Sequence, residues 1–221
     1  MVPNRAGSTA VPLPGELLPR GFFEAPPEKV APLVLGKLLV RSLEDGSVAA
    51  GRIVEVEAYL GPHNHPPDPA AHAYRGPTPR NRVLFGPAGH AYVYSIYGMH
   101  FCMNISCERE GLAGCVLVRA LEPVTGLATM MLNRNLDGEA PLRMLAGGPS
   151  RLCQALGITR PAHNGVDLLD PRSELQIRDD GFAVAQYRVT PRIGITRAAD
   201  RPLRFVAAGY GESRVRGRKL G

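Results

Sequence analysis

The sequence has no run of about 18 apolar residues, the length that a helix needs to cross a bilayer, so we expect no membrane span. Residues 1–16 have neither a sustained apolar period nor the apolar core of a signal peptide, and we expect a flexible N-terminal segment there. Cysteine is scarce, and the four thiols have no CxxC spacing. Reduced, mostly buried thiols are therefore expected, with no metal and no cofactor.

What is present is the composition of a folded, basic protein. Hydrophobic residues make up 44% and charged residues 21% of the 221 residues, which suits one domain and is short for two. We predict a single domain over residues 17–210 and a basic tail over 211–221. The formal net charge of +6 comes mainly from arginine and favours a polyanionic partner such as nucleic acid. A generally arginine-rich bacterial protein is the alternative interpretation.

Strand patterns outnumber helical patterns. Apolar alternation and turn residues predict strands at 38–41, 50–59, 91–97, 101–106, 115–121, 174–177, 191–196 and 203–206. Helices are predicted at 28–36, 122–132 and 149–156. Because the strands do not alternate regularly with helices, we predict an α+β fold: a curved, mainly antiparallel sheet with flanking helices and a protruding β-hairpin over 91–106.

The strand predicted over 50–59 carries two glutamates. Alternate residues of a strand share a face, so Glu55, Glu57 and Tyr59 should project together. The opposite, apolar face should pack in the core and comprises Val54, Val56 and Ala58. Two glutamates on a solvated face are the alternative interpretation of this pattern.

Residues 60–82 are rich in proline and histidine, which predicts a long loop of the kind that often carries function. His63 and His65 have no further ligand at metal spacing, so we expect no metal site. His72 alone indicates little. The arginines of this region that suit phosphate contacts are Arg75, Arg80 and Arg82.

The hairpin over 91–106 has an apolar tip. Tyr92 and Tyr94 are expected on one face, whereas Tyr97 and Met99 lie at the turn. An exposed apolar tip is unfavourable unless it meets a partner, and a wedge that enters a base stack is one such use. Packing of the tip on a neighbouring loop is the alternative.

Five blocks closely resemble the alkyladenine (3-methyladenine) DNA glycosylase family. They occur in the same order as in that family and are GRIVEVEAYLG over 51–61, TPRNR over 78–82, YVYSIYGMHFCMNIS over 92–106, VRALEP over 118–123 and GGPSRLCQAL over 147–156. The resemblance extends from about Leu17 to Val206. It implies a monomeric base-excision repair enzyme of the cytoplasm, associated with the nucleoid if the source is bacterial.

The resemblance implies a reaction on duplex DNA. An alkylated or deaminated purine, such as 3-methyladenine, 7-methylguanine, hypoxanthine or ethenoadenine, would be flipped out and its N-glycosidic bond hydrolysed by an activated water. Glu57 would be the general base and Arg119 would help to hold the water. Main chain near residues 193–195 would supply a carbonyl to the same water.

Further roles follow from the same resemblance. The side chains that would stack on and hydrogen-bond the flipped base are Tyr59, His72 and Tyr94. Asn104 would crowd the 2-amino group of normal guanine. Tyr97 would fill the gap in the base stack, with Met99 beside it and with Arg80 and Arg82 on the DNA.

The chain departs from the mammalian members in places. Residues 63–69 form a longer segment, and His100 stands where those proteins have tyrosine. No lysine falls at a pocket position, so the resemblance implies a monofunctional glycosylase without lyase activity. Two other functions are weighed beside it: a non-catalytic protein that recognises damaged DNA, and an RNA-binding or formyltransferase-type accessory domain.

Overall fold

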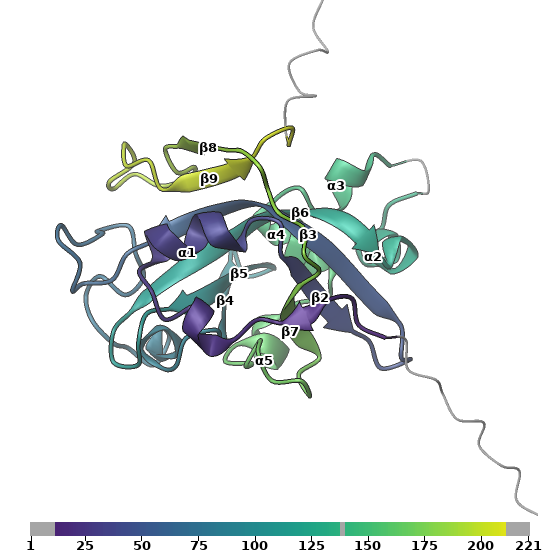
Figure 1. Ribbon diagram of the computed structural model, residues 1–221, viewed down its shortest axis with the longest axis horizontal. Helices are drawn as coiled ribbons and strands as arrows, with labels where there is room; N and C mark the ends of the chain where they lie inside the picture. Colours follow the sequence, from purple (N-terminus) through teal and green to yellow (C-terminus); the bar gives the residue numbers. More distant parts are fainter. Residues whose placement is uncertain (1–11, 138–139, 211–221) are drawn as a thin grey trace, which may run out of the picture.

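Nine antiparallel strands form one sheet in the computed structural model, which describes residues 12–137 and 140–210 (Figure 1). The strands are β1 (Glu16–Leu17), β2 (Leu38–Ser42), β3 (Val48–Tyr59), β4 (Ala91–Ile96), β5 (His100–Cys107), β6 (Gly114–Thr125), β7 (Leu175–Asp179), β8 (Tyr187–Thr190) and β9 (Arg204–Ala207). Their main order is β1-β7-β2-β3-β6-β5-β4. The predicted α+β fold is confirmed.

The two longest strands, β3 and β6, form the centre of the sheet (Figure 1). The first part of β3 pairs with β2 and its last part pairs with β9, while β6 runs along its other edge. Both strands are rich in valine, isoleucine, leucine and alanine, which suit a sheet buried on both faces. The centre of the sheet is therefore a rigid support for polar side chains that project from it.

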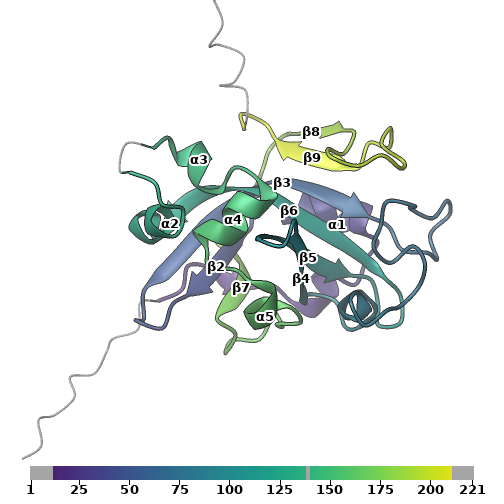
Figure 2. The ribbon, with the colours of Figure 1, turned by 180° about the vertical axis from the view of Figure 1, so that it is seen from behind.

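Short helices flank these strands. They are α1 (Pro27–Val34), α2 (Leu127–Asn133), α3 (Leu142–Ala146), α4 (Pro149–Ala155) and α5 (Arg160–His163), with 3-10 helices η1 (Arg20–Phe22) and η2 (Arg82–Phe85). Helix α1 lies in front of the sheet in Figure 1, and α4 lies in front of β5 and β6 in Figure 2. The core cluster includes Val30 of α1, Leu152 of α4 and Val116 of β6, so one continuous core joins helices and sheet.

The helix predicted over 122–132 is wrong in its first part. Residues 122–125 continue β6, because Pro123 and Thr125 pair with Gly51 and Ala50 of the unusually long β3. The helix begins only after Gly126, whose φ of 75° breaks the strand. Long-range pairing has overridden the local helical signal.

The strand predicted over 191–196 is also wrong. The strand is β8, which ends at Thr190, and residues 191–196 form a loop that returns across the end of β3. Pro191 has no N–H and cannot continue a strand ladder. The other predicted strands and the helices over 28–36 and 149–156 are confirmed within a few residues.

The chain ends lie partly outside the described residues. Residues 1–11 of the predicted flexible segment and the basic tail over 211–221 fall there, whereas Glu16 pairs with Asp179 in the sheet. All four cysteines are free and buried. Within residues 12–137 and 140–210, no helix has the length and apolar character of a membrane span, and no three His, Cys, Asp or Glu side chains are grouped to hold a metal ion.

Candidate active site

Glu57 is fully buried at the centre of the site, with 0% of its surface exposed. Its Oε2 accepts a hydrogen bond from the Tyr59 hydroxyl at 2.9 Å, and its Oε1 accepts one from the Ile193 N–H at 2.8 Å. Arg119 Nη1 lies 3.2 Å from the same Oε1. A carboxylate has about four acceptor positions, so these three donors leave one for a further partner such as water. The alternative of a solvated glutamate is therefore wrong.

An irregularity in β3 sets the direction of its side chains. Register shifts relative to β6 occur on both sides of Glu55, which is the signature of a β-bulge. Val56 and Ala58 pack in the main core as predicted, but Val54 belongs to a separate small cluster with Ala120 of β6. The predicted common apolar face is thus wrong for Val54, because the bulge interrupts the simple alternation.

Arg119 is held in place by a second glutamate. Glu55 Oε1 accepts a hydrogen bond from Arg119 Nε at 2.9 Å and another from Arg204 Nε at 2.7 Å. Burial lowers the pKa of Arg119, but the negative charges of Glu57 and Glu55 raise it by more, so the pKa lies above its usual value. Arg119 is therefore a fixed positive charge directly beside the Glu57 carboxylate.

A cavity of about 200 Å³ is lined by Tyr59, whose hydroxyl donates to Glu57. We call it the aromatic cavity; its lining residues are Tyr59, Ala70, His72, Tyr94, Asn104, Cys115, Gly194 and Ile195. The rings of His72 and Tyr94 lie 4.6 Å apart, nearly perpendicular to each other. Cavities for drug-sized ligands measure about 300–1,000 Å³, so this one suits a fragment on the scale of a single heterocycle.

Burial shifts the pKa values of the titratable side chains around the aromatic cavity in the direction that favours their neutral forms. Burial raises the pKa of Tyr59 well above its usual range, and Glu57 adds to the effect, so its hydroxyl remains a donor. Burial likewise raises the pKa of Tyr94. Burial of the His72 imidazole lowers its pKa, and the positive charge of Arg80 lowers it further. A neutral histidine between aromatic rings does not repel a cationic ring, and the π faces attract one.

Polar contacts fix the walls of the aromatic cavity. His72 Nδ1 and the Tyr92 hydroxyl form a hydrogen bond of 2.9 Å, and burial raises the pKa of Tyr92 to about 12. The buried Asn104 side chain donates to the Tyr92 carbonyl at 3.1 Å. The cavity-facing side chains are thereby held in single orientations.

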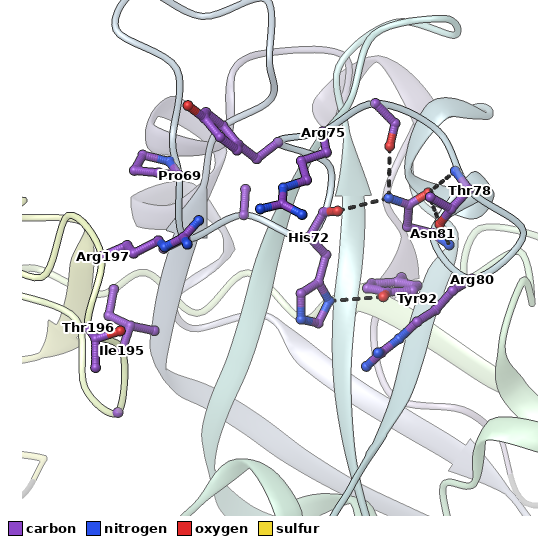
Figure 3. Close-up of a pocket in the computed structure, with 15 residues that line it drawn as sticks. Pro69, His72, Arg75, Thr78, Arg80, Asn81, Tyr92, Ile195, Thr196 and Arg197 are labelled. Atoms are coloured by element: carbon purple, nitrogen blue, oxygen red, sulfur yellow. Dashed lines mark hydrogen bonds between the residues drawn. The ribbon is translucent and has the colours of Figure 1, made fainter.

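A wider groove of about 510 Å³ adjoins the aromatic cavity (Figure 3). It shares His72 and Ile195 with that cavity, and the cations along it are Arg75, Arg80 and Arg197. Arg80 lies 6.0 Å from the Tyr94 ring centroid. Arg82, by contrast, is an exposed residue of η2 and does not line either hollow. The predicted arginine set is thus brought only partly to the site.

The tip of the β4–β5 hairpin projects into solvent. Tyr97 is 92% exposed and Met99 is 78% exposed, and Tyr97 and Gly98 have φ angles of 50° and 74° that close the turn. The tip faces the viewer in Figure 2, beside α4. Packing of the tip on a neighbouring loop, the alternative weighed from the sequence, is wrong.

A buried ion pair supports the cavity and was not predicted. Arg192 and Asp68, both with 0% side-chain exposure, form hydrogen bonds of 2.5 and 2.9 Å. Arg192 also donates to the Ala58 carbonyl at 3.0 Å, and its guanidinium lies 4.5 Å from the Tyr59 ring centroid. The pair joins the loop over 60–82 to the loop over 191–198, and no local sequence pattern marks it because its members are 124 positions apart.

A model of the methylpurine-DNA glycosylase family matches residues 21–211, nearly the whole described chain. The chain belongs to the methylpurine-DNA glycosylase family. As a family member it is a DNA glycosylase, a hydrolase of N-glycosyl bonds, and its reaction belongs to base excision repair of DNA.

Individual relatives agree with this family. A Koribacter versatilis protein is 53% identical over 192 residues, covering 87% of this chain and 90% of its own length. A Methanoculleus marisnigri protein is 52% identical, covering 87% and 95%, and a Burkholderia cenocepacia protein is 48% identical, covering 93% and 94%. Each is provisionally named 3-methyladenine DNA glycosylase. The resemblance drawn from the sequence blocks is confirmed, and the methylpurine-DNA glycosylase family favours an enzyme over the two other functions.

Proposed function

We propose that this glycosylase flips an alkylated or deaminated purine out of duplex DNA into the aromatic cavity and hydrolyses its N-glycosidic bond with a water activated by Glu57. The expected substrates are 3-methyladenine, 7-methylguanine, hypoxanthine and ethenoadenine. The observation that carries the proposal is the buried Glu57 carboxylate, which accepts from three donors, one of them the hydroxyl of Tyr59 in the wall of a small aromatic cavity. We also propose that the enzyme acts as a monomer on nucleoid DNA.

The proposed chemistry divides between two groups. Glu57 removes a proton from the water while positive charge develops at the anomeric carbon. The same carboxylate stabilises this developing charge. Arg119, fixed by Glu55, orients Glu57 and the water. The Ile193 N–H positions the carboxylate, so this segment contacts the catalytic group through its amide; the expected carbonyl contact to water remains part of the proposal.

Recognition would come from the cavity walls. Tyr59, His72 and Tyr94 stack on the flipped base, and Asn104 narrows the cavity against the 2-amino group of guanine. Cationic lesions already carry a good leaving group and are attracted by the aromatic faces. Neutral lesions need a hydrogen bond at the base edge, and His72, held by the Tyr92 hydroxyl, is the proposed partner. Arg80 and Arg82 are the proposed contacts to the DNA backbone.

The direct test is base release from defined duplexes. Oligonucleotides with hypoxanthine, 1,N6-ethenoadenine or a methylated purine should each lose the free base and become alkali-sensitive at that position. The only lysines in the chain are Lys29, Lys37 and Lys219, and neither Lys29 nor Lys37 lines the cavity. Borohydride should therefore trap no covalent complex. Absence of release from every lesion, with lesion binding retained, would instead support the damage-recognition protein.

The hairpin tip provides a second test. Replacing Tyr97 by alanine removes the proposed wedge and should reduce excision from duplex DNA about tenfold, because stacking on a base is lost. Excision from a single-stranded lesion should change little, since no gap in a stack has to be filled. Leu33→Ala is the matched control, because Leu33 is a 57% exposed apolar residue of α1. Equal losses on both substrates would contradict the wedge.

A further inference from the structure

A second hollow, distinct from the aromatic cavity, is lined by Arg119 and Ile193, which both contact the Glu57 carboxylate. It has a volume of about 340 Å³ and lies between α3, the turn before α4, and strands β8 and β9. We call it the arginine pocket, and its charged lining residues are Glu55, Arg119, Arg143, Arg188 and Arg204. Nothing in the reaction described above uses Arg143 or Arg188.

The arginine pocket carries a strong positive charge. Four arginines and one glutamate line the pocket, so the side chains of the pocket carry three more positive than negative charges. Glu55 is already engaged by Arg119 and Arg204. Among the described residues, Arg143 and Arg188 have no acidic partner within ion-pair distance, although Arg188 donates to the Tyr210 carbonyl at 3.2 Å. Such a hollow attracts an anion, and the planar guanidinium matches a phosphate group in particular.

The position of the arginine pocket suggests which phosphate it takes. Arg119 and Ile193 line this pocket, and both also contact the Glu57 carboxylate. Gly194 and Ile195, the next residues along the chain, line the aromatic cavity. Glu57 thus lies between the two hollows. A nucleotide whose base fills the aromatic cavity and whose anomeric carbon adjoins Glu57 has its own phosphates one sugar away, on the side of the arginine pocket.

We propose that the arginine pocket binds a phosphodiester group directly flanking the flipped nucleotide, with Arg143 and Arg188 as its ligands. Arg204, oriented by Glu55 and by Thr190 at 3.0 Å, contributes a fixed positive charge at the back of the pocket. The inference rests on the proposed base flipping and adds a second anchor to it. With base and phosphate both held, the anomeric carbon is fixed over the carboxylate, which is the type of positioning that accelerates a bimolecular attack.

The test combines protein variants with neutral phosphates in a double-mutant cycle. Binding is measured on duplexes that contain one ethenoadenine. Each duplex carries a single neutral methylphosphonate at one of four positions, namely the two nearest phosphates on the 5′ side or the two nearest on the 3′ side of the lesion. Arg143→Ala and Arg188→Ala should each weaken binding to the all-phosphate duplex about tenfold, since a charge-assisted contact is lost. A methylphosphonate directly flanking the lesion should weaken wild-type binding similarly and cause little further loss in the variants.

Salt dependence gives an independent readout. Loss of one phosphate contact should reduce the slope of log affinity against log salt concentration by about 0.9. Arg172→Ala is the matched control, because Arg172 is 88% exposed, lies away from the pocket and pairs with Asp170. It should change neither the slope nor the effect of any methylphosphonate. Both pocket arginines are exposed, so their replacement should leave the fold intact, which thermal unfolding checks.

The outcomes separate this inference from the proposed function. If the arginine substitution and the methylphosphonate reduce affinity independently, so that their effects multiply at both flanking positions, the phosphate site is overturned. It is also overturned if the arginine substitutions are coupled only to the outer phosphates. Because the cycle reads binding, it does not depend on base release. Coupling at a flanking phosphate without any base release would support the arginine pocket while contradicting the proposed hydrolysis.

Discussion

Glu57→Gln should abolish base release while leaving binding to lesion DNA within a fewfold of wild type. Glutamine keeps the shape of the side chain and can still accept from the Ile193 N–H, but it cannot take a proton from water. Loss of a general base reduces a rate by about 10²- to 10⁴-fold. Single-turnover base release and equilibrium binding on the same duplex measure the two effects separately.

Glu122→Gln is the control for this experiment. Glu122 is exposed on the neighbouring strand β6, so the same chemical change there should alter neither rate nor binding. Full activity of Glu57→Gln would remove Glu57 from the mechanism. A variant with lost binding and a lowered melting temperature would show that the buried carboxylate is structural, since Arg119 would then lack one of its two partners.

Asp68→Asn should destabilise the protein and reduce excision together. The substitution leaves the buried Arg192 guanidinium without its counter-charge, and breaking a buried pair costs about 3–5 kcal/mol. For a chain of this size, that corresponds to a fall in melting temperature of roughly 6–20 °C. Thermal unfolding measures this loss, and single-turnover base release measures the effect on Tyr59 and the cavity.

The double variant Asp68→Leu with Arg192→Met distinguishes stability from positioning. Apolar residues that replace a whole buried pair restore much of the stability. Excision should nevertheless stay low, because Arg192 no longer supports the outer face of Tyr59 and no longer joins the two loops. Asp170→Asn, which breaks an exposed pair with Arg172, should change little. Recovery of excision together with stability would show that the pair only stabilises the fold.

Local patterns predicted the two hairpins well. The β2–β3 and β4–β5 pairs join strands close in sequence, with glycine near each turn and apolar residues in period. The predicted helix over 122–132 failed in its first residues, because pairing of β6 with the start of β3 depends on residues about 70 positions away. Strand ends are therefore set by partners that a local window does not include.

Some residues of the candidate site were predictable from the sequence, and others were not. Glu57, Arg119, Tyr59 and Tyr94 were predicted because they fall in blocks that resemble a known family, and the structure brings them together. The burial of Glu57 was not predictable from alternation, since the bulge at Glu55 has no sequence signature. Arg192 and Asp68 stood in a mispredicted strand and in a proline-rich loop, and only folding brings them into contact.

In the proposed mechanism, the catalytic pair stands on the sheet, while part of the recognition surface lies on loops. Glu57 and Arg119 stand on the paired central strands β3 and β6, whereas His72 and Ile195 belong to the two loops that complete the cavity. Loops accept insertions and substitutions far more readily than central strands do. Under the proposed mechanism, substitutions in these loops change the range of excised bases only where they keep the Asp68–Arg192 pair that supports Tyr59. In that mechanism, further lesions are accommodated by substitutions in the loops while the strands that carry Glu57 and Arg119 stay unchanged.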